Sequence, residues 1–436
     1  MNQEIVKHPT FRRLNVKRSL LGFVSTGLSL LVMYGVMSVD FDVTLDLQDG
    51  GQWVFEPWDG DGWWWFAIAG IAIAFTGLRG GTHYEDAEDV ISLFREGETF
   101  PKWLNNPFEL QEMIVELSAA MNLKIRHVYI LDKAIPNAFA SFVLARGNIV
   151  ILHRNLLEIL DPESLRAVLA HELAHVLGRD VKHRLLNILP RLLMNWMLVL
   201  KGVQLLGILL LANTVWAVLD RGLQLLVFTL VATIVIQVVV FFENLYSQVK
   251  ENLADVYGAS YASVEGSINA FLRLNSRSHT LEAFQKVLGL YGASLDEVTI
   301  LKSLHLLPRG AMDLDEIQKV VPRLYAQTKV KDLIEELSLD TTHESQEALV
   351  QTILSEIFKH ASVDNPTELE MDTPFAWKQF DWNHDGFLQG PEIVEMLKNL
   401  RENEAALTSD EGGGSHPSTR DRILLLAEIF HNQLKE

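Results

Sequence analysis

The chain has 436 residues, enough for two or three domains, and its 48% hydrophobic content is high enough that membrane segments are expected. It contains no cysteine, which excludes disulfides, thiolate metal sites and cysteine nucleophiles, and leaves His, Asp and Glu as possible metal ligands. The formal net charge of −19 argues against general affinity for nucleic acid or for anionic lipid head groups.

Four apolar runs predict transmembrane helices, because about 20 apolar residues in helical form cross a bilayer. The first two runs lie in the N-terminal part, and the last two follow one another with a tight turn expected at residues 220–222. The alternative is that the runs are buried core helices of a large soluble protein. Four such runs in one chain make this alternative weaker than transmembrane helices. The predicted spans are 19–38 and 63–79, followed by a hairpin of two helices within 191–242.

The distribution of basic residues predicts the orientation. The tail 1–18 carries five Lys and Arg side chains, whereas the acidic loop 39–62 carries none. By the positive-inside rule, the N-terminus is therefore cytoplasmic and the loop external. An even number of spans returns the polar regions 80–190 and 243–436 to the cytoplasm, where they can assemble into one domain.

The first polar region contains a His-Glu-Leu-Ala-His motif on a predicted helix. Asp161 is a suitable N-cap, followed by proline at the first helical position, and Gly178 is a suitable end. His171 and His175 are four residues apart, so both project from one face and can share a metal ion. Glu172 beside them is placed to take a proton from a metal-bound water. Alone, the motif is also consistent with packed or solvated histidines of an amphipathic helix, so a third ligand must decide.

A candidate third ligand follows the fourth apolar run. Glu251 and Asp255 lie four residues apart on one face of a predicted helix. Glu251 can complete a site of two histidines and one carboxylate, which leaves a fourth position for water. Asp255 can accept a proton from a ligand imidazole and fix its tautomer. Glu243 is the rival ligand, but it lies at the membrane end of the last span and has no aspartate four residues further on.

With these motifs in this order, the sequence resembles the HtpX-type membrane metallopeptidases, which are related to the CAAX prenyl-protein endopeptidases. The motifs are HExxH at 171–175, ExxAD at 251–255, PNAFA at 136–140 in a strand-like alternating run, and SHPSTRDRI at 415–423. The resemblance covers about residues 15–310 and 412–436. It implies a mainly α-helical, gluzincin-like integral membrane domain with a small β-sheet. His171, His175 and Glu251 would bind Zn²⁺ there, and Glu172 would be the general base.

The resemblance also implies how substrate is held and which substrates are cleaved. Asn137, Ala138 and Phe139 would belong to an edge strand on which an extended polypeptide pairs. His416 and Arg422 fall at positions that approach the active site, and both are candidate catalytic residues. The substrates would be membrane or misfolded proteins, degraded for quality control at a bacterial inner membrane by a domain that faces the cytoplasm.

A segment at 310–411 departs from the usual extent of that family and contains the pattern DWNHDGFLQGPE. Oxygen-bearing side chains at positions 1, 3, 5 and 12, glycine at position 6 and an apolar residue at position 8 match an EF-hand calcium loop. Apolar residues on both sides predict two flanking helices. No second loop is evident, although EF-hands usually work in pairs, so a degenerate loop is the alternative. The expected Ca²⁺ ligands are Asp381, Asn383, Asp385, Phe387 and Glu392.

The expected fold is therefore an integral membrane metallopeptidase domain with four transmembrane helices and a helical EF-hand-like insertion. A metallopeptidase domain would be assembled from 80–190, 243–309 and 412–436, with the insertion at 310–411. The leading interpretation is a zinc endopeptidase, with modulation by calcium as a further expectation. A calcium-responsive membrane scaffold with an inert metal site is the first alternative, and Glu172 argues against it. A prenyl-protein protease is a narrower alternative within the enzymes. A transporter is a weaker alternative, because the apolar runs contain almost no ionisable residues.

Overall fold

The structure is a computed structural model that describes part of the chain. The described residues are 3–38, 88–89, 107–131, 133, 135–143, 147–178, 199, 202, 206–207, 210, 215–290, 314–337, 342–360, 375–403, 406–407 and 416–435. Within them the protein is mainly α-helical with one four-stranded sheet, as expected. The predicted external loop, the second predicted span and most of the first half of the predicted hairpin lie outside the described residues.

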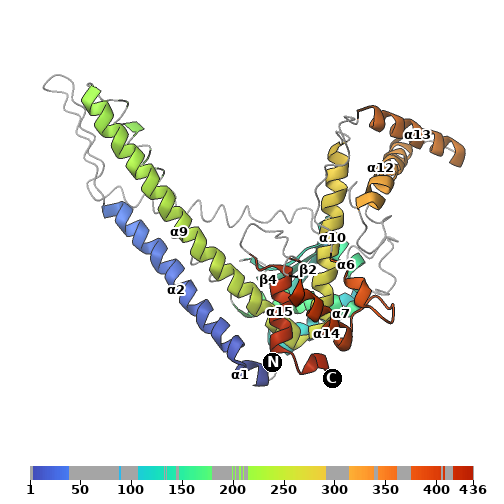
Figure 1. Ribbon diagram of the computed structural model, residues 1–436, viewed down its shortest axis with the longest axis horizontal. Coiled ribbons are helices and arrows are strands. Elements are labelled where there is room, and N and C mark those ends of the chain that lie inside the picture. The colour runs from blue at the N-terminus through green and yellow to red at the C-terminus, as the bar shows by residue number, and fades with distance from the viewer. Residues whose placement is uncertain are drawn as a thin grey trace.

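Two long helices run side by side away from the rest of the molecule (Figure 1). One is α2 (Pro9–Ser38), preceded by the short helix α1 (Gln3–Lys7), and the other is α9 (Val215–Tyr261). The first predicted span lies in α2, where Phe23 is 79% exposed. Among the described residues, one helix is long and apolar enough to cross a membrane, over Leu225–Tyr261, and only 6% of its apolar window is buried.

The predicted turn at 220–222 is wrong, because these residues lie inside α9. Aspartate and arginine are ordinary helix residues, and a single glycine costs a helix only about 1 kcal/mol relative to alanine. The apolar flanks on both sides favour continuing the helix over that small cost. As a result, the exposed apolar part of α9 and the segment that carries Glu251 belong to one uninterrupted helix.

The sheet has the strand order β1-β2-β4-β3. Its central pair, β2 (Ile125–Leu131) and β4 (Gly147–His153), is parallel, while β3 (Ala138–Val143) and the short β1 (Glu88–Asp89) pair antiparallel at the two edges. The apolar run of β4 is buried on both faces. Val150 and Leu152 lie in a core with residues of helix α5 (Pro107–Ala120) and helix α7 (Pro162–Leu177), whereas Ile149 and Ile151 cluster with Tyr129 and Leu131 on the other face. The motif PNAFA therefore leads into an edge strand, as expected.

Helix α7 (Pro162–Leu177) carries the HExxH motif, after the short helix α6 (Arg154–Ile159). Its first turn is capped by Asp161, which accepts a hydrogen bond from the amide of Ser164 at 2.9 Å, with proline at the first position. Gly178 ends the helix. Both predicted boundaries are confirmed. α7 packs against α9, α10 (Val264–Leu290) and β3, so it lies at the centre of the domain.

A second apolar core joins the lower part of α9 to α10, α14 (Gly390–Glu402) and α15 (Thr419–Ile429), with the 3-10 turn η3 (Gln433–Lys435) at the end. The predicted calcium loop lies between α14 and η2 (Trp377–Phe380). Among the described residues, which resume at 375, the element that precedes the loop is a 3-10 turn of four residues. At these residues the full helix that the sequence predicted is not formed. This 3-10 turn is anchored to α10, since the Trp377 indole donates a hydrogen bond to the Ser276 hydroxyl at 2.9 Å.

The helices α12 (Leu314–Leu337) and α13 (His343–His360) pair with each other beyond one end of α10 (Figure 1). Their small core contains Ala326, Val330 and Val350. The two parts of the predicted insertion therefore differ. The α12–α13 pair has its own small core and contacts α10, whereas the predicted calcium loop and α14 share the core of α9, α10 and α15.

Candidate metal centre

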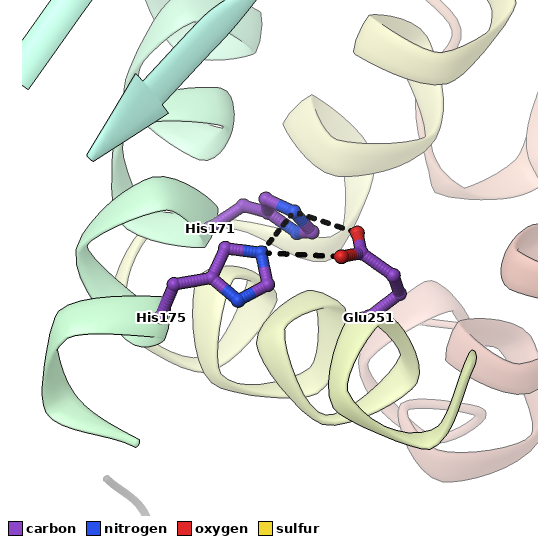
Figure 2. A group of neighbouring side chains, drawn as sticks. All are labelled: His171, His175 and Glu251. Carbon is purple, nitrogen blue, oxygen red and sulfur yellow. Dashed lines mark hydrogen bonds and ion pairs between the residues drawn. The ribbon is translucent and has the colours of Figure 1, made fainter. Parts of the chain in front are cut away.

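Three side chains from α7 and α9 point toward one another (Figure 2). The Nε2 atoms of His171 and His175 are 3.2 Å apart. The same atoms lie 3.5 and 3.6 Å from the two carboxylate oxygens of Glu251. Ligand atoms that bind zinc tetrahedrally, with bonds of about 2.0–2.1 Å, are about 3.3 Å from one another. The three groups therefore have the chemistry and the spacing of three corners of a tetrahedral zinc site.

The i, i+4 spacing on α7 brings the two histidines to one face, and α9 crosses that face with Glu251. Glu243, the rival ligand, lies on the same helix about 12 Å further toward the apolar end, at 1.5 Å per residue. Among the described residues, the group of side chains that could share a metal ion contains Glu251 and not Glu243.

Asp255 lies behind His171, on the side away from the three ligand atoms. One of its carboxylate oxygens is 2.7 Å from Nδ1 of His171. Both of its oxygens accept hydrogen bonds from the guanidinium of Arg422, at 2.6 and 2.8 Å. The guanidinium also stacks over the ring of Phe271 at 4.2 Å. Asp255 is only 1% exposed, and its carboxylate faces Nδ1 of His171. This carboxylate favours the His171 tautomer with Nδ1 protonated, which leaves Nε2 free to bind a metal.

The protonation of His171 follows from its neighbours. Burial opposes the charged imidazole, but the carboxylates of Asp255 and Glu251 outweigh it and raise the pKa of His171 to about 10. In the metal-free protein the imidazole is therefore protonated at neutral pH. A metal ion that binds there has to displace that proton.

Glu172 lies between α7 and the edge of the sheet. Its carboxylate accepts a hydrogen bond from the backbone N–H of Ala140 on β3, at 3.1 Å. Burial raises the pKa of Glu172 above its usual value, although the nearby charges of His171 and His175 partly oppose this rise. The carboxyl group thus has a fixed position and the raised pKa that general bases need near neutral pH.

The two C-terminal candidates reach the site differently. Nδ1 of His416 lies 3.6 Å from a Glu251 oxygen, and its side chain is 55% exposed. The nearby Glu251 carboxylate raises the pKa of His416, against the effect of burial. His416 therefore lies on the solvent side of the metal centre, whereas Arg422 reaches the site through Asp255.

The three predicted substrate-binding residues lie where β3 begins. The carbonyl of Asn137 accepts a hydrogen bond from the amide of His153 on β4, at 2.9 Å. Its exposed side chain accepts one from the amide of Ala138. Ala138 and Phe139 are the first residues of the strand, just before the Ala140 amide that contacts Glu172. The structure thus brings the start of this edge strand to the metal centre.

The predicted calcium ligands lie in a second place, in the loop that precedes α14. Gly386 at position 6 has a φ of +82°, the left-handed conformation for which the loop pattern uses glycine. The five predicted ligands, Asp381, Asn383, Asp385, Phe387 and Glu392, are contained in one loop and the first turn of α14.

Sequence reasoning missed Gly258, which sets the approach of α9 to α7. A Cβ atom at this position would lie 3.0 Å from the backbone nitrogen of His171 and 3.1 Å from its Cα. The two helices are therefore closer here than a side chain allows. The available signal was a glycine inside a helix, three residues after Asp255, where glycine is unfavourable by about 1 kcal/mol.

We expect Gly258→Ala to push α9 away from α7 and separate Glu251 from the two histidines. Overpacking of this kind costs about 1–3 kcal/mol, and zinc affinity should fall by about tenfold or more. Thermal unfolding and the zinc content of the detergent-purified protein measure both effects. Gly222→Ala on the same helix is the matched control, since no residue that the structure describes lies within 4 Å of a Cβ there. Full zinc content in Gly258→Ala would contradict the expectation.

Comparison with known proteins gives a consistent assignment. The model of peptidase family M48 matches residues 105–429. A protease HtpX homolog from Syntrophobacter fumaroxidans is 29% identical over 172 residues, which are 39% of this chain and 60% of that protein. A protease HtpX homolog from Persephonella marina is 39% identical over 72 residues, 16% of this chain and 25% of that protein. Protease HtpX from Legionella pneumophila is 32% identical over 110 residues, 25% of this chain and 38% of that protein.

The chain thus spans less than two thirds of the length of these relatives. No solved structure matches it.

Proposed function

Because this chain belongs to peptidase family M48, we propose that it is a membrane-bound zinc endopeptidase of the HtpX type. The observation that carries the proposal is the tetrahedral spacing of His171, His175 and Glu251, with Glu172 beside them. A structural zinc site has four protein ligands, whereas a catalytic one has three and keeps a position open. Three ligands and an adjacent carboxyl group match the catalytic arrangement.

A zinc ion bound there supplies Lewis-acid polarisation of the scissile carbonyl and lowers the pKa of water. Glu172 takes the proton of the attacking water and passes it to the leaving amine. The Ala140 amide holds the carboxylate in place for both transfers. Asp255, paired with Arg422, keeps His171 oriented as a ligand. His416, on the solvent side of Glu251, is the residue we propose next to the developing negative charge on the carbonyl oxygen.

The proposed substrate is an extended polypeptide that pairs with the open edge of β3, where no strand lies among the described residues. Since the carbonyl of Asn137 faces β4, and backbone groups alternate along a strand, those of Ala138 and Ala140 face away from the sheet. The Ala140 amide contacts Glu172, so this open edge lies against the catalytic group. A chain added there would place a peptide bond beside the metal ligands without requiring a particular side chain.

We propose that the substrates are membrane or misfolded proteins, because the site is joined to helices suited to a bilayer. The exposed apolar length of α9 supports one span, and the parallel course of α2 supports a second. The four-span topology, the cytoplasmic position of the domain and the bacterial inner membrane remain part of the proposal, supported by the basic N-terminal tail and the acidic loop 39–62.

Two alternatives lead to different results in one assay. A scaffold with an inert metal site would bind zinc and cleave nothing. A prenyl-protein protease would cleave a prenylated C-terminal peptide and leave an unmodified protein intact. The open edge of β3 favours the general endopeptidase, since backbone pairing does not select a lipid group.

We also propose that Ca²⁺ modulates this activity by binding in the loop from Asp381 to Glu392. Oxygen atoms at positions 1, 3, 5 and 12, the carbonyl of Phe387 at position 7 and the left-handed Gly386 support it.

The test of the proposed function is cleavage of casein by the detergent-purified chain. We expect cleavage with zinc, loss of nearly all of it with a chelator, and recovery when zinc is restored. A farnesylated peptide run in parallel separates the prenyl-protein protease. Bound zinc with intact casein and intact farnesylated peptide would favour the scaffold.

A further inference from the structure

We propose that the loop from Asp381 to Glu392 is a single calcium site whose missing partner loop is replaced by α10. We further propose that its occupancy is coupled to the metal centre through Arg273. The coupling rests on the proposed zinc site, whereas the calcium site stands on its own observations.

The first observation is a buried oxygen without a partner. Asp381, at position 1 of the loop, is only 6% exposed, and its Oδ1 accepts no hydrogen bond from any residue that the structure describes. The other oxygen, Oδ2, accepts one from the amide of Gly386 across the loop at 2.9 Å, so the carboxylate faces the loop interior. A buried carboxylate oxygen without a partner is costly unless a cation binds it. The oxygen ligands around it suit a hard cation such as Ca²⁺.

The second observation explains how one loop can stand alone. The backbone of Leu388, at position 8, needs a partner, since the side chain is fully buried in the core. The side-chain amide of Asn269 on α10 satisfies both backbone groups. Its oxygen accepts from the Leu388 N–H at 2.8 Å, and its nitrogen donates to the Leu388 carbonyl at 2.8 Å. This is the paired donor and acceptor that a neighbouring strand would supply.

The third observation links the loop to the catalytic helix. One nitrogen of Arg273, one turn further along α10, donates a hydrogen bond to the carbonyl of Gly386. The other lies 3.0 Å from a carboxylate oxygen of Asp161, the N-cap of α7, and donates to the carbonyl of Ile159. A single guanidinium therefore joins the turn of the calcium loop to the start of the helix that carries His171, Glu172 and His175.

These contacts set the sign of the coupling. Bound calcium fixes the conformation of the loop, and the Gly386 carbonyl then keeps the Arg273 guanidinium in place. The guanidinium in turn stabilises Asp161 at the N-cap of α7. A better-held α7 keeps both histidines in position for zinc, so calcium raises zinc affinity. By thermodynamic linkage, zinc raises calcium affinity by the same factor.

The calcium site is tested by isothermal titration of CaCl₂ into the full-length, detergent-purified chain. We expect one site in the micromolar to millimolar range and a rise of a few degrees in the unfolding temperature. Asp385→Ala removes an exposed ligand and should abolish the binding. Asn269→Ala leaves every ligand in place and should weaken it by about tenfold, because Leu388 loses its partner. Asn399→Ala, at an exposed position of α14, is the control and should bind as the parent does.

The coupling is tested by measuring zinc affinity against a chromophoric chelator, with and without saturating calcium. We expect calcium to raise the zinc affinity of the parent by about fivefold or more. Arg273→Gln should still bind calcium and lose this increase, whereas the exposed Arg401→Gln should retain it.

Three results would overturn the inference. They are no calcium binding by the parent, unchanged affinity in Asn269→Ala, and equal zinc affinity with and without calcium. A chain that binds calcium but no zinc would instead overturn the proposed peptidase and, with it, the coupling. Because calcium binding and thermal unfolding need no peptidase activity, the two failures are distinguishable.

Discussion

We expect Glu172→Gln to lower the kcat for casein cleavage by about 10³-fold while zinc remains bound. An amide cannot take a proton from water, so the step assigned to this side chain is lost. The amide oxygen can still accept the hydrogen bond from Ala140, and none of the three ligand atoms changes. Folding and metal content should therefore match those of the parent.

The comparison needs turnover, zinc content and unfolding temperature for each protein. Glu112→Gln, at an exposed position of α5, is the matched control and should be fully active. If Glu172→Gln cleaved casein at the parental rate with zinc bound, Glu172 would not be the base. The scaffold alternative would be favoured only if the parent were equally inactive.

The second large effect is expected at Glu251. Glu251→Gln replaces a charged ligand with a neutral amide, and zinc affinity should fall by at least about 100-fold, more than for a residue that only orients a ligand. Cleavage should be lost at ordinary zinc concentrations and partly recovered at high ones. The measurement is zinc retained after dialysis, together with activity over a range of zinc concentrations.

Glu243→Gln is the discriminating control for this prediction. Both glutamates lie on α9 after the apolar run, and the sequence favoured Glu251 because only it has an aspartate four residues further on. The variant at Glu243 should keep its zinc. Loss of zinc from Glu243→Gln, with retention in Glu251→Gln, would reverse the assignment of the third ligand.

Local features of the site could be predicted from the sequence, because they depend on helix geometry. The four-residue spacing of His171 and His175, and of Glu251 and Asp255, places each pair on one face of a helix whatever the rest of the fold does. The cap of α7 at Asp161 and its end at Gly178 follow from equally local hydrogen bonding.

Contacts between distant segments could not be predicted in this way. Arg422 and Asp255 are 167 residues apart, and Leu388 and Asn269 are 119 apart. No spacing rule joins such positions, because their meeting depends on how α10, α14 and α15 pack. The close approach at Gly258 is a packing property of the same kind.

The wrong turn at 220–222 has a different cause. Polar residues and glycine between apolar runs are typical of a turn, but they are also tolerated inside a helix at a cost of about 1 kcal/mol. Local preference was too weak to decide the question. The predicted calcium loop shows the opposite case. Its pattern could be recognised in the sequence, but the residue that pairs with its backbone is Asn269, which no loop pattern includes.

The continuity of α9 joins the proposed membrane anchor directly to the metal site. The helix is about 70 Å long at 1.5 Å per residue, and its exposed apolar part and Glu251 lie on one uninterrupted helix. The tight contact at Gly258, seven residues beyond Glu251, fixes where α9 meets α7. If the apolar part spans a bilayer, as proposed, a change in bilayer thickness would alter its tilt, and that change would be transmitted along the same helix to Glu251.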